Sequence, residues 1–138
     1  MERHIINPNC VALRDGSASF TFIRLKPGLL RVDVRGVDAG QFGTATLDEL
    51  RMEVMRYQPL ELYIHTDDSV SVTVPVAEEW TRFFAQHRTS LKRVWVYAGS
   101  KLMNLTVAIA QHRSQTGNLI QIFSDSELFE DALQRALA

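Results

Sequence analysis

The chain has 138 residues, of which 46% are hydrophobic, and this is enough for one globular domain with a substantial core. Its 15 basic and 16 acidic residues leave a net charge of −1, so no strong field attracts nucleic acid or an anionic membrane surface. No apolar run approaches the roughly 18 residues of a membrane span.

The N-terminus and the single cysteine indicate the compartment. Residues 1–15, MERHIINPNCVALRD, lack the basic-then-apolar pattern of a secretory signal. Cys10 has no second cysteine with which to form a disulfide, and no evident His partner for nucleophilic chemistry. We therefore expect a cytoplasmic protein.

The first third of the chain predicts antiparallel strands within residues 10–35. Residues 17–25 alternate apolar with polar side chains, and Pro27-Gly28 then forms a turn. In the next strand the apolar residues Leu30, Val32 and Val34 share one face. A strand with this period of two has one buried side and one polar side.

From residue 44 to residue 137 the pattern changes to alternating helices and strands. Thr46 with Glu49 fits a capping box for the first helix, and Ser124 with Glu127 fits one for the last. Further strands are predicted at residues 60–66, 93–99 and 119–125. The four helices have predicted apolar stripes at Leu47, Leu50, Val54 and Tyr57; at Trp80, Phe83, Phe84 and His87; at Leu102, Leu105, Ile109 and His112; and at Leu128, Phe129, Ala132, Leu133 and Leu137.

This order predicts an α/β fold in a single domain, residues 1–138. Strands that are joined by helices run parallel through right-handed crossovers. We therefore expect one mixed, mostly parallel sheet with an N-terminal antiparallel hairpin and about four helices, mainly on one face.

The second face of this sheet is predicted to be partly open. Charged residues such as Arg31, Asp33 and Glu61 interrupt strands that a doubly covered sheet would make apolar on both faces. Aromatic residues, among them Tyr63, Trp95 and Tyr97, lie in the same strands. Such a surface suits a protein partner, including a second copy in a homodimer. Alternatively, the aromatic residues pack under the N-terminal hairpin.

A polar segment follows the strand at residues 60–66 and precedes the second helix. Residues 61–80, ELYIHTDDSVSVTVPVAEEW, place Asp67, Asp68, Ser69 and Ser71 between a strand and a helix. Loops in this position often carry function in α/β proteins. The segment is therefore the first candidate for a functional site.

Residues 28–137 resemble the STAS domain, which is the fold of anti-sigma-factor antagonists, stressosome subunits and the cytoplasmic tails of sulfate transporters. RVDVRGVDAGQFGTATLDEL is similar to the opening of the family, with Gly36, Asp38, Thr46, Leu47 and Leu50 at matching places. LKRVWVYAGSKLMNLTVAIAQHRSQTGNLIQIFSDSELFEDAL resembles its strand–helix–strand–helix close. The resemblance implies a non-enzymatic domain that binds a protein partner, such as a kinase-like anti-sigma factor.

The resemblance also implies a phosphorylation switch. Antagonist-type STAS domains have an Asp-Ser-Ser/Thr-Gly motif before the second helix, and a partner kinase phosphorylates its serine. Asp68-Ser69 matches the first two positions, whereas Val70 and Ser71 depart from the motif, and Pro75 indicates a later helix start. Ser69 and Ser71 are the candidate phosphosites. The expected partner-binding residues are Asp67, Asp68, Ser69, Glu78 and Glu79.

Two other functions remain as alternatives. One is small-molecule binding, of a nucleotide or a lipid: Gly36, Gly40 and Gly43 form a glycine-rich strand-to-helix turn of the kind that can bind phosphate, without a recognised fingerprint. A pocket against these glycines, or between the sheet and the Trp80 helix, would favour it. The other is a hydrolase that uses His65 and Asp67, with Asp68 nearby. The histidines have no metal-ligand spacing, and we expect no cofactor.

Overall fold

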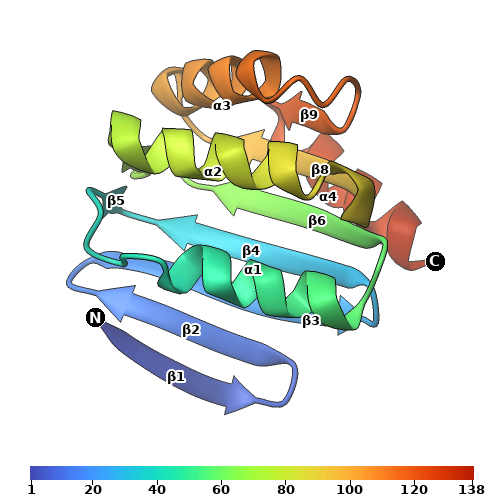
Figure 1. Ribbon diagram of the computed structural model, residues 1–138, viewed down its shortest axis with the longest axis horizontal. Coiled ribbons are helices and arrows are strands. Elements are labelled where there is room, and N and C mark those ends of the chain that lie inside the picture. The colour runs from blue at the N-terminus through green and yellow to red at the C-terminus, as the bar shows by residue number, and fades with distance from the viewer.

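Seven strands form one mixed sheet in the computed structural model, which describes residues 1–138 (Figure 1). The spatial order of the strands is β1-β2-β3-β4-β6-β8-β9. They are β1 (Glu2–Asn7), β2 (Cys10–Asp15), β3 (Ala18–Lys26), β4 (Leu29–Arg35), β6 (Leu60–Thr66), β8 (Leu91–Ala98) and β9 (Ile120–Phe123). Two short strands, β5 (Val37–Asp38) and β7 (Ser71–Val72), pair separately.

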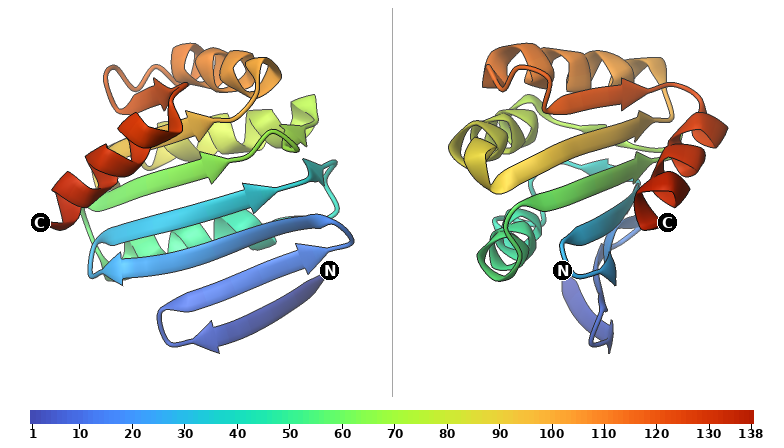
Figure 2. Two further views of the ribbon diagram at one scale, coloured as in Figure 1. Left: turned by 180° about the vertical axis from the view of Figure 1, so that it is seen from behind. Right: turned by 90° about the vertical axis from the view of Figure 1, so that its right-hand side faces the viewer.

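The predicted α/β class is confirmed. Strands β1 to β4 are antiparallel, and β4, β6, β8 and β9 are parallel. The helices are α1 (Ala45–Arg56), α2 (Val74–Gln86), α3 (Lys101–Ser114) and α4 (Ser126–Leu137), and a short 3-10 turn, η1 (Arg88–Ser90), follows α2. Helices α1, α2 and α3 lie on one face of the sheet, and α4 lies on the other (Figure 2). No helix is both long and apolar enough to span a bilayer.

Strand β1 is a strand that the sequence pattern did not indicate. All six of its residues are exposed, including Ile5 and Ile6, so its sequence lacks the alternation that one buried face imposes. It pairs with β2 through the register Glu2↔Arg14 to Asn7↔Cys10. Backbone hydrogen bonds to β2 therefore hold β1 at the edge of the sheet, and the outer side of β1 pairs with no other strand.

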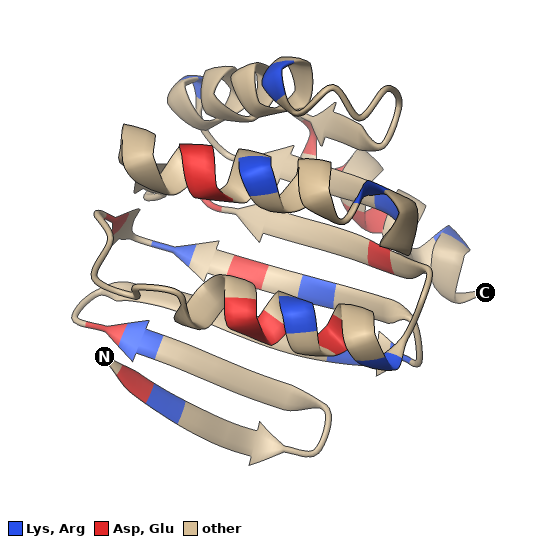
Figure 3. Ribbon diagram, in the orientation of Figure 1, with Lys and Arg blue, Asp and Glu red and all other residues tan.

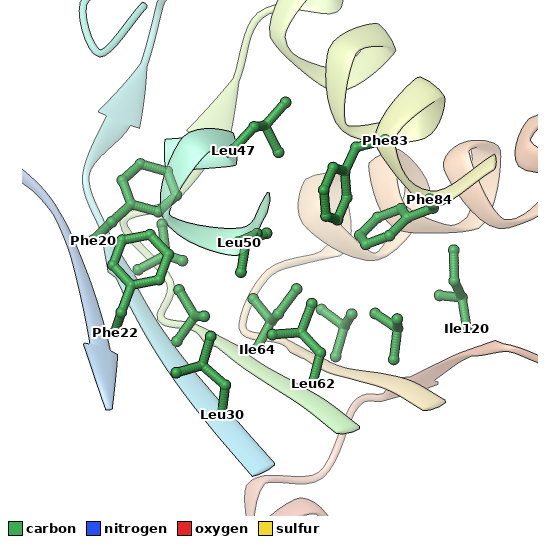
Figure 4. Packing of buried hydrophobic residues seen from close by; sticks show 14 of the residues in the cluster. Phe20, Phe22, Leu30, Leu47, Leu50, Leu62, Ile64, Phe83, Phe84 and Ile120 are labelled. Carbon is green, nitrogen blue, oxygen red and sulfur yellow. The ribbon is translucent and has the colours of Figure 1, made fainter. Parts of the chain in front are cut away.

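The main core lies between the sheet and helices α1 to α3 (Figure 4). Alternate residues of the strands, such as Leu30, Leu62 and Val94, point into it and are almost fully buried. The stripes predicted for the first two helices supply the other side: Leu47, Leu50 and Val54 from α1, and Phe83 and Phe84 from α2. Full burial of such a side chain stabilises a fold by about 1.5–3 kcal/mol.

A second, smaller core lies under α4 and bears on both interpretations of the aromatic face. Phe129 and Leu133 of α4 pack on Leu29 and Tyr63, with aromatic side chains of β8 and β9 around them. The centroid of the Phe129 ring lies 6.2 Å from that of Tyr97. These aromatic residues thus pack under α4, so neither an open face at these residues nor packing under the N-terminal hairpin was a correct prediction.

The predicted apolar stripe of α3 was also wrong. Leu102, Leu105 and Ile109 are 59%, 59% and 48% exposed. The buried side of α3 carries Met103, Ala110 and Ser114 instead. Small residues at this face let the helix approach α2 and the sheet closely, which a stripe of leucines would prevent. An apolar strip of α3 therefore faces outward.

Neither predicted capping box forms. Helix α1 begins at Ala45 after Thr44, and Thr46 is buried in its first turn. Helix α4 is capped by Asp125, whose carboxylate accepts hydrogen bonds from the backbone amides of Glu127 and Leu128. A carboxylate at this position is at least as good a cap as a serine hydroxyl and also complements the helix dipole, so the helix begins one residue later than Ser124 predicts.

Candidate functional site

The β6–α2 turn, residues 67–73, follows the carboxyl end of a central parallel strand. Asp67 accepts a hydrogen bond from the Ser69 amide at 2.9 Å and another from the Ser69 hydroxyl. The same hydroxyl accepts a hydrogen bond from the Gly36 amide at 3.0 Å. Ser69 therefore ties this turn to the end of β4.

The pairing of β5 with β7 holds the second half of the turn. Ser71 lies opposite Val37, and its amide donates to the Gly36 carbonyl at 3.4 Å. The Thr73 amide donates to the Asp38 carbonyl at 3.1 Å. The two candidate phosphosites thus differ: Ser69 is exposed at the tip of the turn, and Ser71 is half-buried within a strand.

Helix α2 begins only at Val74, with Thr73 as its N-cap and Pro75 in its first turn. Proline is well tolerated there because its missing amide would have no partner within the helix. The exposed hydroxyl of Ser69 consequently lies outside the first turn, and the amides nearest to it belong to the turn and to Gly36.

The expected partner-binding residues fall on two surfaces. Asp67, Asp68 and Ser69 lie together in the turn, where Asp67 is 3.9 Å from the Nε atom of Arg35. Glu78 and Glu79 are exposed on α2. Glu78 faces the groove between α2 and α3, whereas Glu79 is close enough to Asp38 to affect its pKa. Residues of both charge signs alternate along α1, α2 and β4 (Figure 3).

Asp38 is a buried carboxylate beside this turn, and it is 4% exposed. Burial raises its pKa above the ordinary value of 3.8, a hydrogen bond from the Gly40 amide acts in the opposite direction, and the Glu79 carboxylate raises it further. Between pH 3.8 and the raised pKa, the Asp38 carboxyl is therefore mostly protonated in the folded protein and mostly ionised in the unfolded chain.

The raised pKa of Asp38 predicts that the free energy of unfolding depends on pH. The contribution of Asp38 to the free energy of unfolding is fully present below pH 3.8 and is lost as pH rises through the raised pKa. In Asp38→Asn, whose amide oxygen can still accept from Gly40, we expect this decline to disappear. Urea denaturation across the acidic range measures it. Glu79→Gln should weaken the decline, and identical pH profiles in all three proteins would contradict the assignment.

The three glycines of the β4–α1 turn use their amides within the protein. The Gly36 amide donates to Ser69, that of Gly40 to the Asp38 carboxylate at 2.9 Å, and that of Gly43 to the Gly40 carbonyl at 3.0 Å. Gly36 has a φ of 79°, and a Cβ there would lie 2.8 Å from the Cα atom of Ala18. These amides maintain the turn, and phosphate binding by the glycines stays a prediction.

His65 and Asp67 lie in different surroundings. The His65 ring lies on the α4 face of the sheet, 4.8 Å from the ring of Tyr97 and 6.0 Å from that of Phe129, measured between centroids. Asp67 bonds to Ser69 instead. No hydrogen bond joins the two residues, and no group of three His, Cys, Asp or Glu side chains could hold a metal ion. His65 and Asp67 therefore do not form the hydrogen-bonded pair that a hydrolase using these two residues would need.

A cavity lies between the sheet, α2 and α3. The predicted helix stripes did not identify all of the residues that line it. It has a volume of about 80 Å³ and is lined by Val70 and Val72 of the β6–α2 turn, by Trp80 of α2 and by Met103 and Val107 of α3, among others. A pocket between the sheet and the Trp80 helix is one of the two features that we expected to favour small-molecule binding. Its α3 wall was missed because the predicted stripe of that helix was wrong.

Comparison of the chain with protein-family models, with characterised proteins and with solved structures found no match in any of the three.

Proposed function

We propose that the protein is a non-enzymatic regulatory domain of the STAS type, which binds a protein partner through the β6–α2 turn. The observation that carries the proposal is the tip of the turn that follows β6, where Asp68 and Ser69 are exposed and Asp67 is half-buried. The order of strands and helices from β3 to α4 is compatible with that family. The partner is expected to be a cytoplasmic regulator, such as a kinase-like anti-sigma factor.

Chemistry at Ser69 supplies a means of control. Its hydroxyl donates to Asp67 and accepts from the Gly36 amide. A phosphate ester has no proton to donate to Asp67, and it adds about −2 charge beside that carboxylate. Repulsion should open the tip of the turn, and Arg35, whose Nε lies 3.9 Å from the Asp67 carboxylate, is a cation that could bind the phosphate. Phosphorylation would thus change both the charge and the shape of the docking surface.

The proposal predicts position-specific cross-links in living cells. A photo-cross-linking amino acid in place of Asp68 should capture a defined protein, because this position lies at the tip of the turn. The same amino acid in place of Gln58 is the control, since Gln58 is equally exposed but lies between α1 and β6, at the opposite end of the strands. Cross-linked products are identified by mass spectrometry.

The same preparation tests the switch. Phosphate should be found on Ser69, or on Ser71, and the cross-link from position 68 should be lost in the phosphorylated fraction. If positions 58 and 68 capture the same proteins, docking through the turn is wrong. If docking is specific but neither serine is ever phosphorylated in the presence of the cognate kinase, only the switch is wrong.

A further inference from the structure

The cavity between the sheet, α2 and α3 has no free polar group. Its floor includes Val34, Ile64 and Val96 of the sheet, and twelve of its fourteen lining residues are hydrophobic. The two threonine hydroxyls are already used: Thr66 donates to the Tyr97 carbonyl at 2.8 Å, and Thr106 donates to the Leu102 carbonyl at 2.9 Å. A buried water needs about two to four polar partners, so this space suits an apolar group.

A wider groove on the outer surface between α2 and α3 adjoins the cavity. This groove has a volume of about 560 Å³, and it shares Val72, Ala77, Thr106 and Ala110 with the cavity. Helices α2 and α3 lie side by side here (Figure 1). Ala77 and Ala110 line both spaces, so only small side chains separate the inner space from the outer one at these two positions. Val74 and Ile109, both exposed, add apolar surface along the groove.

The groove also carries two arginines that form no ion pair within the protein. Arg82 comes from α2 and Arg113 comes from α3, and both are exposed. Every ion pair of the protein involves other residues. Glu78 lines the same groove and offsets one of these two positive charges, which leaves the lining with a net positive charge. A guanidinium binds a carboxylate through two parallel hydrogen bonds, which makes such a pair suitable for an anionic head group.

From these features we propose that the α2–α3 groove binds a free, single-chain aliphatic carboxylate. The end of the chain enters the cavity, the rest of the chain lies along Val74 and Ile109, and the carboxylate contacts Arg82 and Arg113. A cavity of 150 Å³ can hold benzene, so about 80 Å³ admits only the last few carbons. This site does not depend on partner docking at the β6–α2 turn.

Trp80 lines the cavity and therefore reports its occupancy. The second tryptophan, Trp95, packs under α4 on the other face of the sheet. In Trp95→Phe, decanoate added below its micelle concentration should shift the Trp80 emission in a saturable manner. The matched control is Trp80→Phe, in which Trp95 remains and decanoate should change nothing. Calorimetry of the unmodified protein gives the dissociation constant.

Two further comparisons test the head group and entry into the cavity. Arg82→Gln and Arg113→Gln should each weaken decanoate binding about fivefold to tenfold, with no effect on decanol, and decylamine should bind more weakly than decanoate. Ala110→Leu should block all of these chains. Ala77→Leu is the second blocking variant, in case circular dichroism shows that the first does not fold.

Three results would overturn the proposal: no decanoate-dependent change at Trp80, equal binding of decanoate and decylamine, or undiminished binding in a folded blocking variant. Vesicles of phosphatidylglycerol should not sediment with the protein. Sedimentation with vesicles in the absence of decanoate binding would mean that the arginines contact a membrane surface and not a free carboxylate.

Discussion

Replacing Phe129 with alanine is expected to lower the free energy of unfolding by about 3–5 kcal/mol. Phe129 is fully buried, and its ring lies 5.8 Å from that of Phe123 and 6.2 Å from that of Tyr63, measured between centroids. It is the largest side chain that α4 inserts into the second core. The loss would be a large part of the 5–15 kcal/mol that stabilises a typical domain.

Leu128→Ala is the matched control for this variant, because Leu128 is the preceding residue of the same helix and is 58% exposed. It should cost within about 0.5 kcal/mol. Urea denaturation followed by tryptophan emission measures both variants, and Trp95 reports directly on the face under α4. Equal losses in the two variants would mean that α4 does not pack on this face.

Gly99→Ala is expected to cost about 3 kcal/mol, at the upper end of ordinary overpacking. A Cβ at residue 99 would lie 2.5 Å from the Thr66 carbonyl oxygen and 2.6 Å from the carbonyl carbon of Asp67. Both are backbone atoms of β6 and the turn that follows it, so they cannot move aside as a flexible side chain could. The Gly99 amide also bonds to the Thr66 hydroxyl at 3.3 Å, which holds the two strand ends together.

The control for Gly99 is Gly117→Ala. Gly117 has a φ of 65°, but a Cβ there would meet no atom within 4 Å. Only the conformational cost of about 1–2 kcal/mol applies. Thermal unfolding of both variants, with the wild type alongside, distinguishes close packing from backbone conformation. A Gly99→Ala protein as stable as Gly117→Ala would show that β8 does not approach the end of β6 so closely.

The sequence predicted the elements whose buried side is a simple repeat. Leu30, Val32 and Val34 alternate along β4, and Leu47, Leu50 and Val54 recur at helical spacing along α1, so both elements follow from periodicity. Helix α4 was predicted from the same kind of signal. Its position on the opposite face of the sheet was not, because periodicity gives a buried side without saying which surface covers it.

The misses have a common physical cause, which is that packing against neighbours outweighed the local pattern. In α3 the leucines remain exposed because small residues such as Ala110 permit the close approach of α2. Strand β1 has no buried face at all, so no period could reveal it. At the candidate site, the residues Asp67, Asp68 and Ser69 predicted a polar turn. The hydrogen bond from the Gly36 amide to Ser69 could not be predicted, because it joins residues 33 positions apart. Such a contact depends on how β4 and β6 align.

Val70 and Ser69 are adjacent, yet they belong to different places in the molecule. The Ser69 side chain is exposed and bonded to Gly36, whereas Val70 is 3% exposed and forms part of the cavity wall. A displacement of the turn that carried Val70 with it would change this wall. Coupling of this kind is reciprocal. If an occupant of the cavity favours one position of Val70, it changes the free energy of moving Ser69. Moving Ser69 then changes the binding free energy of that occupant by the same amount. Each site could exist without the other, but with both occupied this shared peptide unit would be the point at which one affects the other.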